Sequence, residues 1–225
     1  MRKRTPVQWI ISIALYCVGL MCLAFAVSFS ANAGLGISPV RSLPYVVASC
    51  LGMEAKVGTM VTIVFCFYIL LQILILRKEF KIFNLLQILF STLFGYFVNF
   101  AKAIMGSWRI MDGYAGSLIM LAISIVITAL GVYIYVGTDV INMPMEGLTM
   151  AIAQKLKKPF PKVKTVVDCS VVALGLILSI VVLRSPFKWI REGTIISALA
   201  TGFMVSLFRK IFGQSVAKLA YGGDK

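Results

Sequence analysis

Apolar residues gather into long runs along this chain, and polar or charged positions separate the runs. A membrane span needs about 20 mostly apolar residues. Six runs reach that length or come close to it, at about residues 6–29, 57–76, 82–101, 114–136, 163–183 and 193–208. The pattern predicts an all-α integral membrane protein with about six transmembrane helices.

Two further apolar runs, Ser42–Met53 and Gly147–Gln154, lie between the spans. Each follows a bend that contains proline and glycine, and each is too short to cross a bilayer. Two interpretations stay open. Each run forms a re-entrant helix enclosed by protein, where irregular backbone is tolerated at membrane depth, or it forms an amphipathic helix that lies flat at the surface.

The order of these elements repeats along the chain. Each half has a long span, a proline bend, a short apolar run, a span, a short loop and a last span. Because three is an odd number, the second half must enter the membrane from the opposite side. This predicts an inverted-topology repeat, which is typical of many secondary transporters. The single membrane domain then has repeat one at about 6–105, repeat two at about 113–213, and a cytoplasmic tail at 214–225.

Composition agrees with lipid as the main solvent. Hydrophobic residues make up 60% of the 225 residues and charged residues 13%, whereas soluble domains have about 45–50% and about 25%. Fifteen of the 22 Lys and Arg residues fall on the cytoplasmic side if the N-terminus is cytoplasmic. This bias predicts that both termini are cytoplasmic. It also accounts for the net charge of +14, so we expect no nucleic-acid partner.

A cleaved signal peptide is the alternative for the first span, because Ala31-Asn32-Ala33 resembles a signal-peptidase site. The apolar stretch before it exceeds the roughly 7–15 residues of a signal-peptide core. We therefore expect this span to stay in the protein.

The residue types restrict the chemistry. Histidine is absent, which removes the commonest metal ligand and general base. The five cysteines are odd in number and lie mostly inside apolar runs, where cysteine usually acts as a small hydrophobe. We expect no disulfide framework, no metal site, no cofactor and no enzyme activity.

Ionisable residues within a membrane are costly and mark functional sites by default. Glu146 follows the second proline bend, and Arg41 falls opposite it when the two repeats are set side by side at Pro39 and Pro144. The two charges either meet near the middle of the membrane or lie separately at its interfaces. Asp139 ends the fourth span, where a simple helix-end charge is the favoured interpretation.

Asp168 lies four residues after Lys164 in the fifth span, so both side chains share one helix face. A structural ion pair and a cation or proton site are both open. The residues that we predict along a substrate path are Arg41, Glu146, Asp168, Lys164, Asp139, Pro39 and Pro144.

Several segments carry a resemblance to a known family: Gly34-Leu35-Gly36-Ile37-Ser38-Pro39 followed by Leu43-Pro44-Tyr45-Val46, Pro144-Met145-Glu146-Gly147-Leu148-Thr149, Lys162-Val163-Lys164 with Asp168, and the run from Arg191 to Leu199. In these the chain resembles the YczE-like bacterial membrane proteins, which are loosely akin to the YitT-type proteins. The resemblance covers most of the chain. It implies a multi-span protein of the bacterial inner membrane, from a family whose function is uncharacterised.

Two functions remain in view. The favoured one is a transporter or channel-like protein that moves a small solute or ion. The alternative is a non-transporting accessory, scaffold or regulatory protein. The expected partners are the lipid bilayer and an unidentified small solute or ion, and a homo-oligomer is compatible with the sequence.

Overall fold

The computed structural model describes residues 5–53, 57–185, 187–213 and 215–221, and all regular structure in these ranges is helical. Six helices in the described residues, with their adjoining turns, are long and apolar enough to cross a membrane. This confirms the predicted number of spans. The helices are α1 (Pro6–Ala33), α3 (Val57–Leu76), α4 (Gln87–Met105), α5 (Gly113–Gly137), α7 (Phe160–Leu178) and α8 (Glu192–Phe212).

Two short helices lie between the long ones, α2 (Pro39–Cys50) and α6 (Pro144–Leu156). With 12 and 13 residues they are about 18–20 Å long at 1.5 Å per residue, well below the roughly 30 Å of a bilayer core. Both begin a few residues before the predicted runs. The prolines open the helices rather than precede them, since a first-turn residue needs no intrahelical N–H bond.

Some helix ends differ from the prediction. The predicted span 82–101 opens with a 3-10 segment, η3 (Ile82–Leu86), after another, η2 (Arg77–Glu79), and α4 continues to Met105. The predicted span 163–183 begins earlier, at Phe160, because Pro161 suits the first helical turn. It ends in a π-helical turn, η4 (Ser179–Leu183).

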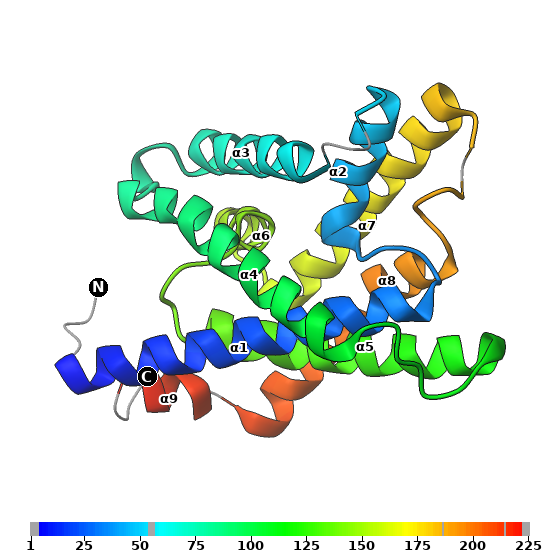
Figure 1. The fold of residues 1–225 in the computed structure, drawn as a ribbon. Coiled ribbons are helices and arrows are strands. Elements are labelled where there is room, and N and C mark those ends of the chain that lie inside the picture. Colours follow the sequence, from blue (N-terminus) through cyan, green and yellow to red (C-terminus); the bar gives the residue numbers. More distant parts are fainter. Residues whose placement is uncertain (1–4, 54–56, 186, 214, 222–225) are drawn as a thin grey trace.

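Helices α1 and α5 cross in close contact over much of their length, in the lower part of Figure 1. Gly19 and Gly131 allow this approach. A Cβ added at Gly19 would lie 2.7 Å from Tyr135 Cβ and 3.0 Å from the Gly131 oxygen. A Cβ added at Gly131 would lie 2.8 Å from the Gly19 oxygen. Small residues therefore bring the two backbones together, as is common between membrane helices.

Most of the other helix contacts come in corresponding pairs when the first half of the chain is compared with the second. Helix α2 packs against α7, and α6 packs against α3. Helix α4 packs on α1, and α8 packs on α5. The last pair of each half breaks the pattern, because α7 and α8 pack closely whereas α3 and α4 have little contact. Figure 1 shows α3 and α4 diverging from the turn that joins them.

Large apolar side chains cover the outer surface of the described bundle. On α3 alone Phe67, Leu70 and Leu74 are 52%, 50% and 60% exposed. Soluble monomers rarely carry apolar patches of more than a few hundred Å². Lipid chains are the solvent that accommodates such a surface.

The described part of the predicted tail forms a short helix, α9 (Ser215–Tyr221), which packs against α1. The Ser12 hydroxyl donates a hydrogen bond of 3.3 Å to the Ala220 carbonyl. Residue 214 and residues 222–225 of that tail lie outside the described residues. So do the basic residues 2–4 and Lys56, which contribute to the orientation prediction.

Candidate functional site

A cavity of about 180 Å³ lies where all six long helices and both short helices meet. Four ionisable side chains line it: Arg41 from α2, Glu146 from α6, and Lys164 and Asp168 from α7. Most of the remaining lining is apolar. Four of the seven residues predicted for a substrate path thus gather at one cavity, and Pro39 lines it as well.

The beginnings of the two short helices face this cavity. Ser38, Pro39 and Arg41 line it from the start of α2, and Met143 and Glu146 line it from the start of α6. A helix N-terminus carries partial positive charge from its unpaired N–H groups. In α6, Glu146 in the first turn offsets this charge, whereas the first turn of α2 holds no acid and Ser38 gives no side-chain cap.

Glu146, Lys164 and Asp168 form a buried ionic triad. The Lys164 Nζ lies 3.3 Å from Glu146 Oε1 and 3.1 Å from the Asp168 carboxylate. The three residues are only 5%, 2% and 2% exposed. The Lys164–Asp168 pair has the four-residue spacing seen in the sequence, whereas Glu146 comes from another helix. Removing three charges from water is expensive, so each depends on the others.

Buried tyrosines surround the triad. Tyr135 and Tyr16 lie near Glu146, and Tyr68 lies near both carboxylates. Their hydroxyls make no hydrogen bond of normal geometry with any described residue, although Tyr135 is directly beside Glu146. The triad is therefore shielded from bulk water, which strengthens the attraction of the carboxylates to Lys164.

Arg41 occupies the cavity differently. It lines the wall together with Glu146, but the structure contains no ion pair between them. Within the described part of the chain its guanidinium makes no hydrogen bond or ion pair, and the carboxylates nearby are bound to Lys164. The cavity thus contains a paired cation and an unpaired one.

A pair of glutamines holds the start of α6 at one side of the cavity. Gln72 of α3 and Gln87 of α4 exchange two amide hydrogen bonds of 3.1 and 3.0 Å. Gln72 also donates to the Pro144 carbonyl at 2.9 Å. Gly147 leaves the room for this pair, because a Cβ there would lie 2.7 Å from Gln72 Oε1. Pro144 itself is buried and does not line the cavity, although Met143 and Glu146 on either side of it do.

A second set of hydrogen bonds joins the loop between α1 and α2 to the start of α8. The Leu35 carbonyl accepts from the Gly193 amide at 2.9 Å, and the Ile37 carbonyl accepts from the Thr194 hydroxyl at 2.7 Å. Arg191 donates to the Gly34 carbonyl at 2.9 Å. Two of the segments that carried the family resemblance therefore bind one another, between the end of α1 and the start of α8.

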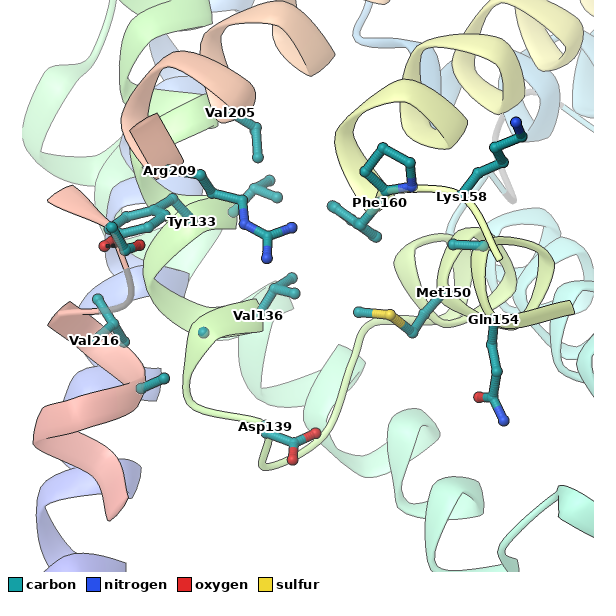
Figure 2. Close-up of a pocket in the computed structure, with 16 residues that line it drawn as sticks. Tyr133, Val136, Asp139, Met150, Gln154, Lys158, Phe160, Val205, Arg209 and Val216 are labelled. Carbon is teal, nitrogen blue, oxygen red and sulfur yellow. Dashed lines mark hydrogen bonds between the residues drawn. The ribbon is translucent and has the colours of Figure 1, made fainter. Parts of the chain in front are cut away.

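A second hollow, the outer cleft, opens at the end of the bundle where α1 begins and α9 lies. It measures about 470 Å³ and is formed by the ends of α5, α6 and α8, the start of α7, and α9. Figure 2 shows Arg209 of α8 reaching into it, Asp139 below in the loop after α5, and Lys158 on the opposite wall. Asp139 thus belongs to this exposed cleft and not to the central cavity.

One helical turn separates the outer cleft from the central cavity. Phe160 lines the cleft and Lys164, four residues on, lines the cavity. Val205 and Thr201 have the same relation on α8, and Val132 of α5 lines both hollows. Phe160, Val205 and Val132 are buried at 6%, 2% and 1% exposure and pack in one cluster. An apolar layer about one helical turn deep therefore lies between the two hollows.

Acidic and cysteine side chains do not assemble as ligands here. Among the described residues no three His, Cys, Asp or Glu side chains lie close enough to hold a metal ion. The five cysteines are free thiols.

Sequence reasoning missed Gln72, Gln87, Tyr135 and the apolar layer. Gln72 and Gln87 carried a signal, since an amide within or beside an apolar run needs a buried partner. The apolar layer carried none, because its residues look like any others that face a core.

Six apolar helices, a lipid-suited exterior and charges buried at the centre define a multi-span membrane protein. The chain belongs to the family of unknown function DUF6198, whose model matches residues 10–210. This agrees with the uncharacterised family that the sequence implied, and the narrower kinship with YczE-like proteins stays a prediction. No curated protein and no solved structure matches the chain.

Proposed function

We propose that the protein moves a small solute or ion across the bacterial inner membrane by way of the central cavity. The observation that carries the proposal is the buried triad of Glu146, Lys164 and Asp168 on the wall of a cavity that every long helix lines. Charges at such depth are costly to maintain, and in membrane proteins they mark ion and substrate pathways. We propose no catalytic role for them.

The two hollows supply a path with a gate. The outer cleft is the vestibule on the side that we assign to the cytoplasm. The layer of Val132, Phe160 and Val205 is the gate on the cytoplasmic side of the cavity. The loop bound to the start of α8 closes the cavity on the other side of the membrane. Solute in the cavity would reach the cytoplasm when the one-turn layer opens.

An inverted repeat fits this path. If each helix is replaced by its counterpart in the other half, the α2–α7 contact becomes the α6–α3 contact. The starts of both short helices also face one cavity. Both features support re-entrant short helices that enter from opposite sides. In transporters with inverted repeats, substrates bind between the repeats near such interrupted helices. Alternating access would then arise from rocking of one half against the other.

The test is transport in liposomes that contain the purified protein. Uptake should be measured for a broad radiolabelled panel of amino acids, amines, carboxylates, sugars and monovalent ions. At least one member should accumulate above protein-free liposomes, and Glu146→Gln and Asp168→Asn should reduce its uptake at least tenfold. Glu79→Gln is the matched control, because Glu79 is an exposed carboxylate away from the cavity.

Two outcomes would contradict the proposal. One is uptake at the protein-free level for the whole panel by folded protein. The other is uptake that Glu146→Gln and Asp168→Asn leave unchanged. Either would favour the accessory or scaffold role that the sequence also allowed.

A further inference from the structure

The unpaired guanidinium of Arg41 distinguishes the central cavity from a purely structural ion cluster. Lys164 already serves both carboxylates, and Arg41 has no ionic partner in the described part of the chain. Arg41 is only partly exposed, at the wall of the cavity, and a poorly solvated charge without a partner is unfavourable. The cavity next to Arg41 is the place from which an anion would reach it.

The start of α2 adds to this preference. Arg41 lies in the first turn of a helix whose N-terminal end faces the cavity, with no acid in that turn and no side-chain cap from Ser38. The helix end and the guanidinium therefore both favour negative charge at the same spot. A planar guanidinium also suits a carboxylate, since it can donate two parallel hydrogen bonds.

The charges in the cavity limit what can bind. Lys164 and Arg41 are two cations, and Glu146 and Asp168 are two carboxylates, so the ionised set sums to zero. A bound monoanion leaves one excess negative charge in a poorly solvated space, which is unfavourable. One proton on a carboxylate of the triad restores neutrality.

The groups around the carboxylates leave them as the proton site. Lys164 faces both from α7, and Arg41 lines the same wall from α2. Tyr16 of α1, Tyr68 of α3 and Tyr135 of α5 surround them, and Cys169 follows Asp168. Tyrosine and cysteine are neutral near pH 7 in their protonated forms, and Lys and Arg already carry their protons. A carboxylate is the remaining group that can accept one.

The outer cleft and the cavity size agree with a small anion. Two cations, Lys158 and Arg209, and one anion, Asp139, line the cleft (Figure 2). Such an excess of positive charge concentrates anions near an entrance. The cavity of about 180 Å³ is below the roughly 300–1,000 Å³ of pockets for drug-sized ligands, and its wall is mostly apolar.

We propose that Arg41 binds the carboxylate of a small, mainly apolar monocarboxylate, and that one proton binds with it to the Glu146–Asp168 pair. This rests on the proposed function for its physiological meaning and names the substrate class of the same cavity. In the binding step, Arg41 holds the carboxylate of the solute by hydrogen bonds. A proton from the solvent bonds to a carboxylate oxygen of Glu146 or Asp168. No covalent bond of the solute changes.

Binding and proton uptake by the purified protein test the proposal. Pyruvate, lactate and benzoate are the probes, titrated calorimetrically and in weakly buffered solution with a pH dye. We expect at least one to bind with uptake of about one proton per molecule. Propionamide and propylamine, which lack the carboxylate, should not bind. Arg41→Gln should weaken probe binding at least tenfold, and Arg41→Lys should retain part of it.

The carboxylate variants separate the two halves of the proposal. At least one of the two variants, Asp168→Asn and Glu146→Gln, should still bind the probe, and it should take up fewer protons than the parent protein. Lys162→Gln, an exposed cation on the same helix as Lys164, should change neither quantity. Size-exclusion chromatography confirms that each variant is folded.

Three results would overturn the inference. They are failure of all three carboxylates to bind the parent protein, binding without proton uptake, and binding that Arg41→Gln leaves unchanged. If another solute is transported while the carboxylates fail to bind, the inference falls and the proposed function stands. If a carboxylate binds as expected but no panel member enters liposomes, transport falls and the anion site stands.

Discussion

Among single residues, Lys164 has the largest share in keeping the cavity charges together. Its ammonium is the ion-pair partner of both Glu146 and Asp168, which have no other ionic partner in the described residues. The triad carries one net negative charge, and without Lys164 it would carry two. Loss of this one side chain therefore affects two buried carboxylates together.

We predict that Lys164→Met lowers the free energy of unfolding by about 3–5 kcal/mol, the usual cost of removing one partner from a buried ion pair. Thermal and denaturant unfolding in detergent would measure it. Lys162→Met is the control, because Lys162 is exposed on the same helix and exposed charges contribute about 0–1 kcal/mol. Equal effects of the two substitutions would mean that the triad contributes little to stability.

A second substitution should restore part of the loss. Lys164→Met with Asp168→Asn has the same net charge as the original triad, so the double variant should be more stable than the sum of the single effects. Contacting residues typically couple by about 0.5–3 kcal/mol. Strict additivity of the two changes would contradict a direct interaction between them.

One of the two ion pairs of the triad could be predicted from the sequence, and the other could not, for a physical reason. The Lys164–Asp168 pair is local, so helix periodicity places it on one face. The Lys164–Glu146 pair joins two helices across a turn, and no local rule fixes that distance. The alignment of the halves set Arg41 opposite Glu146. Both line one cavity, but the structure pairs Glu146 with Lys164 instead.

At the scale of helices, the crossing of α1 and α5 depends on having no side chain between the backbones. We predict that Gly131→Ala destabilises the protein by about 1–3 kcal/mol, as overpacking commonly does, because the new Cβ would lie 2.8 Å from the Gly19 oxygen. Unfolding temperature in detergent would measure the effect. Apart from the neighbouring backbone of α4 itself, no atom lies within 4 Å of a Cβ added at Gly95.

Gly95→Ala is therefore the control for the crossing. Alanine in a helix is more favourable than glycine by about 0.5–1 kcal/mol, so this variant should be as stable as the parent or slightly more stable. A loss at Gly95 equal to that at Gly131 would show that both effects come from the helices themselves and not from their crossing.

The sequence predicted the helices better than their arrangement. Length and apolarity fix the spans, because lipid leaves backbone groups to be satisfied within each helix. The starts of α2 and α6 were placed too late, since proline signals a bend and a first helical turn equally. The divergence of α3 and α4 had no sequence signal. Gln72 and Gln87 join the adjacent ends of α3 and α4, and Gln72 also binds the start of α6.

Access to the cavity is a property of the whole molecule and depends on the layer between the hollows. We predict that Phe160→Ala speeds the labelling of a Thr201→Cys variant by a water-soluble thiol reagent that enters through the outer cleft. Both changes are made in a background without the five native cysteines. Thr201 lies in the cavity, one turn beyond Val205. Val166→Ala, an exposed position on α7, should leave the labelling rate unchanged. Equal rates in both variants would show that Phe160 does not control access.

The orientation of the chain is a separate prediction. Reporter fusions after residues 80, 160 and 222 should report the cytoplasm, and fusions near 109 and 188 should report the outside. The prediction is based on the excess of Lys and Arg on one side of the predicted spans. An external signal from a fusion after residue 160 would reverse the assignment of the outer cleft to the cytoplasm and would also contradict the inverted repeat.

The glycine crossing of α1 and α5 has a mechanical consequence. A contact without intervening side chains can act as a fulcrum, where a tilt displaces atoms least. Pro6 lies 13 residues from Gly19, a lever arm of about 20 Å at 1.5 Å per residue. A tilt of about 10° would hardly move the crossing but would shift the start of α1 by about 3 Å over that arm. The same sweep would carry α9, which rests on α1 and forms one wall of the outer cleft. Glycine at the fulcrum thus turns a small rotation into a change in the width of the entrance.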